Sequence, residues 1–176
     1  FIRHHRLLHH LHLLYYLYMM KIKTIFVLFI CLSVGRGFAQ DVNQSRIRHF
    51  NLQNGIALQG YDPVAYFTHQ RAVKGKKSVG TIFFQGVTYL FSSEENKAAF
   101  KKSPAMYEPQ YGGWCAYAMG SDGSKVEVDP ETFKIIDSRL YLFYNKLFNN
   151  TIKPWKKNET KLKQQADVNW AKIFNK

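Results

Sequence analysis

The sequence predicts one domain of the α+β class, in which two β-hairpins form a small antiparallel sheet packed with a central helix and a C-terminal helix. The chain has 176 residues, of which 46% are hydrophobic and 16% aromatic, enough for one packed core. Two segments combine β-branched and aromatic residues around a turn, and a long segment near the C-terminus repeats apolar residues at helical spacing. These observations exclude a disordered chain and favour a mixed fold.

The two expected hairpins have similar compositions. In the first, Thr81-Ile82-Phe83-Phe84 and Val87-Thr88-Tyr89-Leu90-Phe91 flank the turn pair Gln85-Gly86. In the second, Phe133-Lys134-Ile135-Ile136 and Leu140-Tyr141-Leu142-Phe143-Tyr144 flank Asp137-Ser138-Arg139. Runs of this composition on both sides of a short polar turn predict a strand, a turn and a strand.

The central helix is predicted directly after the first hairpin. Ser92-Ser93 can cap a helix, and Glu94-Glu95 would lie near the positive end of its dipole, whereas Ser103-Pro104 would end it. The C-terminal helix is predicted from Glu159 to Phe174. Its face is marked by four apolar residues at every fourth position, namely Leu162, Ala166, Trp170 and Phe174.

Three shorter segments have weaker signals. Asp62-Pro63 predicts a turn or a helix start, because Asp is a common N-cap and Pro a common first helical residue. Residues 126–128 suggest a short strand, and Asp129-Pro130-Glu131 a turn or a brief helical start. Residues 145–155 are expected to be helical in part.

The N-terminal part of the sequence does not resemble a folded domain. Residues 1–18 contain no methionine and hold five of the seven histidines among leucines and tyrosines. We expect them to be translated upstream sequence, with the natural start at Met19 or Met20. The alternative is a histidine-rich metal-binding tract, which no acidic or cysteine ligand accompanies.

Residues 19–39 are predicted to be a secretory signal peptide. Lys21 and Lys23 precede an apolar run from Thr24 to Val34, and Gly37-Phe38-Ala39 provides a small-x-small site for cleavage after Ala39. The run is shorter than the roughly 20 residues that span a bilayer, so no transmembrane span is expected after cleavage. We therefore expect an exported protein, periplasmic or extracellular, with a flexible lead-in over 40–54 and the domain over 55–176.

The chain is basic, with 25 Lys and Arg residues against 12 Asp and Glu residues. Five of the basic residues and none of the acidic ones precede Gln40, so an excess of eight basic residues would remain after cleavage. Most of this excess is lysine in the last 25 residues, typical of solvated helix faces, and no nucleic-acid-binding motif accompanies it. We expect no nucleic-acid partner, while anionic lipid and cell-wall polymer remain open.

Cys115 would be the only cysteine of the mature chain, because Cys31 lies in the predicted signal peptide. A lone cysteine in an oxidising compartment cannot form an intramolecular disulfide. It is then a buried structural thiol, a reactive group, a single metal ligand or an intermolecular partner. Lipidation of Cys31 is a weaker alternative, because bulky Phe29 and Ile30 precede it.

An ordered set of motifs resembles the YHS domain family and, in its second half, the longer exported bacterial branch of that family. The motifs are Gly60-Tyr61-Asp62-Pro63-Val64-Ala65-Tyr66-Phe67; Gly86, Tyr89, Phe91, Ser92 and Ser93; Phe100, Pro104 and Tyr107; Pro109-Gln110-Tyr111-Gly112-Gly113 with Cys115-Ala116; Val128-Asp129-Pro130; and Arg139-Leu140-Tyr141-Leu142-Phe143-Tyr144-Asn145. The resemblance covers roughly Gly55 to Phe174.

The resemblance implies both a metal-binding and a thiol-based interpretation. Short YHS modules are regarded as metal-binding and have cysteines at the positions that Ala65 and Ser92 occupy here, so a closed metal site is not expected. Members of the longer branch keep a cysteine after the Gly-Gly pair, and some have selenocysteine there. This favours a redox or soft-ligand role for Cys115.

Three hypotheses follow, in this order. The first is a binding module that holds a soft transition metal ion or a small ligand in a pocket around Cys115. The second is a thiol redox protein in which Cys115 is catalytic and needs an external resolving thiol. The third is a non-catalytic envelope interaction domain. The proposed pocket residues are Tyr61, Asp62, Tyr66, Tyr111, Gly112 and Gly113, with Cys115 as the metal ligand. No paired carboxylates, phosphate loop or Ser-His-Asp arrangement is apparent, so an enzyme is the less favoured class.

Overall fold

The computed structural model describes residues 17–21 and 42–174. The chain divides into two units, Phe1–Asp41 and Val42–Lys176, and the strands found among the described residues lie in the second. Most of the predicted upstream segment and signal peptide lies outside the described residues, apart from a helical turn at 17–21. Among the helices that are described, none is long and apolar enough to cross a membrane.

The first predicted hairpin is confirmed as strands β3 (Thr81–Phe84) and β4 (Val87–Leu90), paired antiparallel. Gln85 and Gly86 both have positive φ, 46° and 85°, as a two-residue turn between twisted strands requires. The short strands β1 (Leu52–Gln53) and β2 (Ile56–Ala57) complete a four-stranded sheet of order β1-β2-β4-β3. In this sheet β2 runs parallel to β4, with Ile56 opposite Thr88.

The central helix is confirmed as α3 (Glu94–Lys102). Ser93 caps it, since the Asn96 N–H donates to the Ser93 hydroxyl oxygen over 3.2 Å. Phe100 packs against the Tyr89 ring of the first sheet at a centroid distance of 4.7 Å, with the two rings tilted by 38°. The short helix α4 (Pro104–Tyr107) follows at the expected Ser103-Pro104 boundary.

The second predicted hairpin is confirmed as β5 (Asp129–Ile136) and β6 (Arg139–Phe143). The α+β class is therefore confirmed, but the two hairpins lie in separate sheets. β3 pairs with one edge of β4 and β2 pairs with the other, so β4 has no edge left for the second hairpin. β6 instead forms bridges to Pro109 and Cys115. The expected turn at Asp129-Pro130-Glu131 is wrong, because β5 begins there, and residues 126–128 form no strand.

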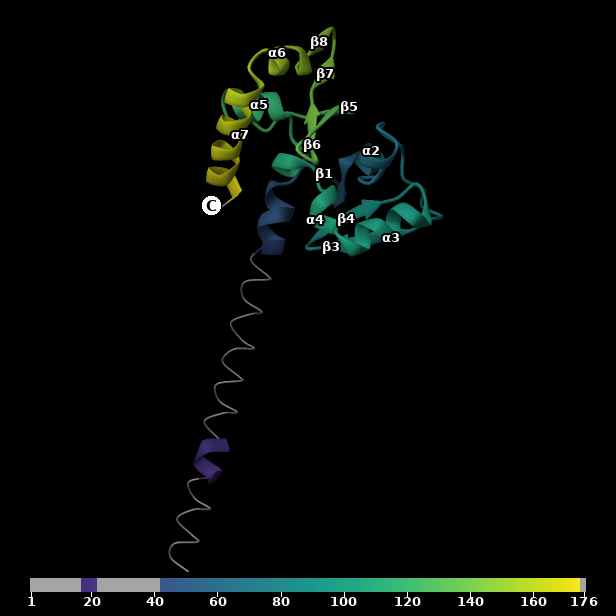
Figure 1. Ribbon diagram of the computed structural model, residues 1–176, viewed down its shortest axis with the longest axis vertical. Coiled ribbons are helices and arrows are strands. Elements are labelled where there is room, and N and C mark those ends of the chain that lie inside the picture. The colour runs from purple at the N-terminus through teal and green to yellow at the C-terminus, as the bar shows by residue number, and fades with distance from the viewer. Residues whose placement is uncertain (1–16, 22–41, 175–176) are drawn as a thin grey trace, which may run out of the picture. The chain divides into compact units, whose positions relative to one another are not determined.

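The C-terminal part contains a small hairpin and two helices. Strands β7 (Asn145–Lys146) and β8 (Asn149–Asn150) precede α6 (Ile152–Lys157). Residues 145–155, which were expected to be helical in part, are therefore helical only in their last third. Helix α7 (Glu159–Phe174) has the predicted bounds. It packs beside α5 (Ala116–Ser121), as Figure 1 shows.

The expected flexible lead-in is folded where it is described. Residues 42–49 form a helix, and Arg46 on it is 5% exposed. The Arg46 guanidinium pairs with the Glu108 carboxylate, and its Nε donates to the Gln85 carbonyl over 2.9 Å. The segment has no regular row of apolar residues that would predict a helix. Its buried contact with the domain is made by Arg46.

Two apolar clusters make up the core, and the segment from Tyr107 to Met119 lies in both. One cluster surrounds α3 and the first sheet, and Cys115 belongs to it. The other surrounds Trp155 and takes Tyr111, Ala116 and Met119 from the same segment. Consecutive residues therefore join the two halves of the domain, and Cys115 stands at the boundary.

Candidate functional site

Cys115 is fully buried at the start of α5. Its backbone N–H donates to the Val126 carbonyl over 3.0 Å, and it bridges Leu142 of β6. The preceding 3₁₀ turn, η2 (Gln110–Gly113), contains three consecutive residues with positive φ: Tyr111 at 54°, Gly112 at 60° and Gly113 at 87°. This turn leads the chain from α4 into α5.

Gly112 is required by close packing as well as by its conformation. A Cβ atom there would lie 2.7 Å from Phe50 Cδ1 and 2.9 Å from the Trp170 ring. The Gly112 carbonyl also accepts a hydrogen bond from the Asn51 N–H over 2.9 Å. The Gly-Gly pair therefore positions Cys115 by shaping the backbone.

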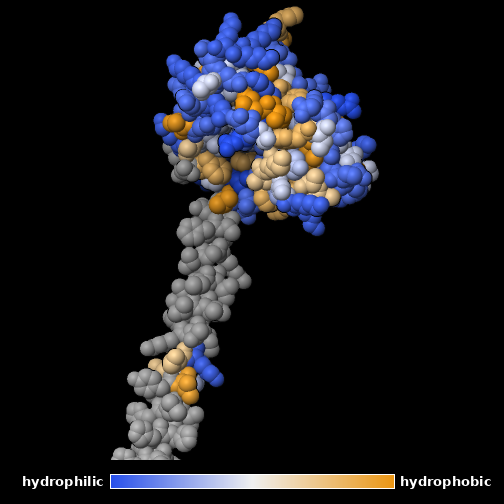
Figure 2. All heavy atoms as spheres, viewed as in Figure 1, coloured by the Kyte–Doolittle hydropathy of each residue, from blue (hydrophilic) through white to orange (hydrophobic). Residues whose placement is uncertain are grey.

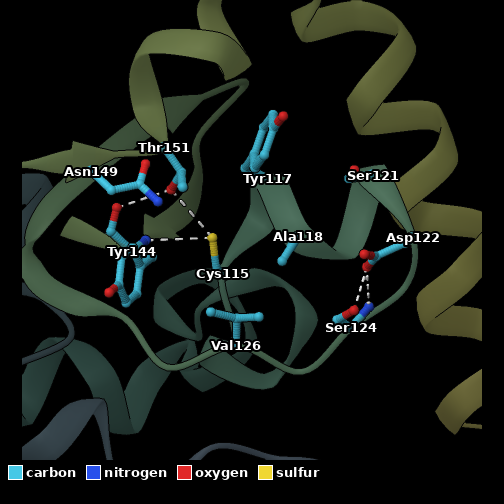
Figure 3. Close-up of a pocket in the computed structure, with 10 residues that line it drawn as sticks. All are labelled: Cys115, Tyr117, Ala118, Ser121, Asp122, Ser124, Val126, Tyr144, Asn149 and Thr151. Atoms are coloured by element: carbon cyan, nitrogen blue, oxygen red, sulfur yellow. Dashed lines mark hydrogen bonds between the residues drawn. The ribbon is translucent and has the colours of Figure 1, made fainter. Parts of the chain in front are cut away.

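The Cys115 sulfur belongs to a closed set of hydrogen bonds (Figure 3). The Tyr144 N–H donates to Sγ over 3.4 Å, and the Thr151 hydroxyl lies 3.4 Å from Sγ. Thr151 Oγ1 also donates to the Tyr144 carbonyl over 3.0 Å. Because that bond uses the hydroxyl proton, the Cys115 S–H donates to the Thr151 hydroxyl oxygen.

A pocket of about 280 Å³ opens beside Cys115. Its volume is close to the lower end of the roughly 300–1,000 Å³ typical of ligand sites. One wall comes from α5 and the segment after it, and the other from Tyr144 between β6 and β7, from β8 and from the residue after β8 (Figure 3). Beside Cys115 the lining residues are Tyr117, Ala118, Ser121, Asp122, Ser124, Val126, Tyr144, Asn149 and Thr151.

Asp122 gives the pocket a negative charge. Its Oδ1 accepts hydrogen bonds from the Ser124 hydroxyl and from the Ser124 N–H, the latter over 2.9 Å. These bonds, led by the one from the hydroxyl, hold the pKa of the Asp122 carboxyl below its ordinary value. The carboxylate is therefore ionised at neutral pH and favours cations and hydrogen-bond donors.

Asp62 does not lie at this pocket, although the sequence suggested it as a pocket residue. It is fully buried, and Oδ1 accepts the N–H groups of Val64 and Ala65 over 2.9 and 3.3 Å. Oδ2 accepts the N–H and hydroxyl of Ser92 and the side-chain amide of Asn96 at 2.6–2.7 Å. Asp62 thus joins the turn before α2 (Ala65–Thr68) to the start of α3.

The suggested tyrosines also lie elsewhere. The Tyr61 hydroxyl donates to Glu131 over 3.1 Å, and burial, followed by that hydrogen bond, raises the Tyr61 pKa. The Tyr66 hydroxyl donates to the Pro130 carbonyl over 3.1 Å. The Tyr111 hydroxyl donates to Asp167 over 2.9 Å, and burial raises its pKa. Each phenol is used to join parts of the fold.

The structure therefore brings none of the six suggested ligand-binding residues to the pocket with Cys115. The sequence did not indicate the polar lining residues Asp122, Tyr144, Asn149 and Thr151. Asn149-Asn150-Thr151 carried a usable signal, because Asn and Thr are common residues at the start of a helix and Pro154 follows close behind, as Pro does in a first helical turn.

The residues around Cys115 do not suit a soft metal ion. Such an ion takes several thiolate or imidazole ligands, whereas the sulfur here contacts a hydroxyl and a backbone amide. Within residues 17–21 and 42–174, no three His, Cys, Asp or Glu side chains are grouped for a metal. His49 Nδ1 lies 3.0 Å from Lys125 Nζ, and His69 Nδ1 lies 2.8 Å from the Thr68 hydroxyl.

Comparison of the chain with models of protein families, with curated proteins and with solved structures gives no match.

Proposed function

We propose that this chain is an exported YHS-like domain that binds a small neutral or cationic organic ligand in the pocket beside Cys115. The observation that carries the proposal is the pocket itself, which gathers polar side chains from segments far apart in the sequence. The ordered motifs between Gly60 and Asn145 support the family part of the proposal, and the signal-like segment at 19–39 supports export.

The pocket lining indicates the chemistry of the ligand. In the part of the chain that the structure describes, no residue hydrogen-bonds the side chains of Tyr117, Ser121 or Asn149. These groups can both donate and accept. Ala118 and Val126 add apolar surface, and Asp122 adds one negative charge. A small ligand with hydroxyl or amine groups on a short carbon frame matches this set.

Cys115 forms part of the inner wall in this proposal and is not a nucleophile. It is fully buried, and its sulfur already has a donor and an acceptor. It is also the only free cysteine in the described residues, so a redox cycle would need a thiol from another molecule. The geometry therefore favours binding over thiol chemistry.

Ligand mapping by NMR tests the proposal. Fragment-sized amines and polyols are added to the ¹⁵N-labelled protein, and we expect shift changes to cluster on Tyr117, Asn149 and Thr151. Ser121→Trp places a large ring at the pocket and should weaken binding at least tenfold, whereas Ser78→Trp, at an exposed serine in another turn, should not. Shift changes that cluster elsewhere, or equal affinity in both variants, would contradict the proposal.

Two further measurements separate the alternatives. Asp122→Asn should weaken the binding of amines and leave neutral polyols unchanged, because it removes the charge and keeps the shape. A thiol reagent should label Cys115 only after denaturation. Rapid labelling of the folded protein would favour the redox hypothesis instead.

A further inference from the structure

The turn between β7 and β8 exposes two large apolar side chains. Leu147 is 89% exposed and Phe148 is 108% exposed relative to the extended reference state. Figure 1 places this turn at one end of the domain beside α6, and Figure 2 shows a hydrophobic projection at that end surrounded by hydrophilic surface. We call residues 146–157 the tip.

The turn has an unfavourable sequence for its backbone. Leu147 and Phe148 both have positive φ, 50° and 66°, in a two-residue hairpin where Asn-Gly adopts the same geometry with less strain. Nothing in the fold of the domain requires large side chains there, since both point into solvent. Their exposure leaves both side chains available for contact with another molecule.

The charged residues of the tip are all lysines. No Asp or Glu occurs between Asp137 and Glu159, and the tip carries Lys146, Lys153, Lys156 and Lys157, all exposed. Three of the lysines are spaced i, i+3 and i+4 in α6 and share one face, and Trp155 is buried within the same helix. Glu159, the nearest carboxylate after the tip, is paired with Lys134.

We propose that the tip docks on an anionic phospholipid bilayer, with Leu147 and Phe148 inserted among the acyl chains and the lysines facing the phosphates. Two protruding apolar side chains reach the shallow interfacial depth of about 5–10 Å at which peripheral proteins bind. The lysines supply the second signal that stable but reversible attachment needs. A polyanion without an apolar phase would leave Leu147 and Phe148 in water. The proposal does not depend on the ligand pocket.

Quenching of tryptophan fluorescence by brominated lipids, measured in the full chain with a tryptophan at position 148, tests the proposal. Phe148→Trp is mixed with vesicles of phosphatidylglycerol and phosphatidylcholine that carry brominated acyl chains. Phe83→Trp is the matched control, because Phe83 is also exposed, 71%, but lies on β3. Because Trp114, Trp155 and Trp170 also fluoresce, the quenching of the wild-type chain is subtracted, and the remaining signal reports the introduced tryptophan.

We expect bromolipid quenching above the wild-type background with Phe148→Trp and not with Phe83→Trp, and little quenching in vesicles of phosphatidylcholine alone. The lipid concentration for half-maximal quenching should rise about fivefold for each of Lys153, Lys156 and Lys157 replaced by Gln. In a sedimentation assay, Leu147→Asn with Phe148→Gly should weaken vesicle binding and leave the melting temperature equal or higher.

Three results would overturn the proposal. Equal quenching at positions 83 and 148 would show non-specific adsorption. Equal quenching in neutral and anionic vesicles would remove the role of the lysines. No quenching at position 148 in either vesicle would exclude the bilayer and point to a protein partner for the tip.

Discussion

Replacing Arg46 by alanine should destabilise the domain by about 3 kcal/mol, because removing one partner of a buried ion pair typically costs about 3–5 kcal/mol. The side chains of Arg46 and Glu108 are only 7% and 13% exposed. The substitution also removes the donor to the Gln85 carbonyl and a guanidinium 4.4 Å from the Phe50 ring centroid. Glu108 keeps the hydrogen bond from the Tyr89 hydroxyl, so we take the lower end of the range.

Urea unfolding followed by circular dichroism measures this loss, and the thermal midpoint should fall by roughly 10 °C. Arg48→Ala is the control, since Arg48 is an exposed arginine of the same helix, and it should change stability by less than about 0.5 kcal/mol. Arg46→Ala with Glu108→Ala should be less unstable than the sum of the two single variants. If Arg46→Ala behaves like Arg48→Ala, residues 42–49 are not part of the cooperative unit and the reasoning fails.

Three further predictions concern packing, a buried carboxylate and pH. Gly120→Ala should destabilise by about 1–3 kcal/mol, because the new Cβ would lie 2.4 Å from the Leu162 carbonyl oxygen of α7; a urea midpoint within error of wild type would contradict it. Asp62→Asn should lower the free energy of unfolding by about 2 kcal/mol, because the NH₂ group of the new amide would face N–H and O–H donors. An unchanged urea midpoint would mean that Asp62 does not accept these hydrogen bonds. The pKa of His49 is lowered by burial, then by Lys125 and Arg48, so the unfolded chain binds the proton more tightly and stability should fall as pH drops below 6.5. His49→Gln should reduce this slope in unfolding curves measured across pH, and an identical slope would assign it to other groups.

The parts of the fold that could be predicted are those fixed by neighbouring residues. Ser93 with Glu94 and Glu95 is sufficient to start α3, and Gln85-Gly86 is sufficient to turn the first hairpin. The N-terminal helix could not be predicted in this way, because its buried contact joins Arg46 to Glu108, 62 residues away. The parallel pairing of β2 with β4 rests on one residue pair and also leaves no local pattern.

The sequence indicates the cysteine at the centre of the candidate site but not the residues that surround it. Cys115 could be selected because it was the only cysteine outside the signal-like segment. Its hydrogen-bond partners, Tyr144 and Thr151, lie 29 and 36 residues further along and reach it only because β6 and β8 fold back. Asp62 seemed to be a free carboxylate in the sequence, whereas the fold surrounds it with donors from two elements.

The contact between the ends of the domain has a consequence for the order of folding. The Ser45 hydroxyl donates to the Phe174 carbonyl over 3.2 Å across 129 residues, and the Phe50 ring lies 6.1 Å from Trp170 and 6.2 Å from Phe174. During synthesis the N-terminal helix cannot complete its packing until α7 has emerged. The same proximity makes a circular permutant that joins residue 174 to residue 42 by a short linker geometrically feasible, with new ends in an exposed turn such as 121–124.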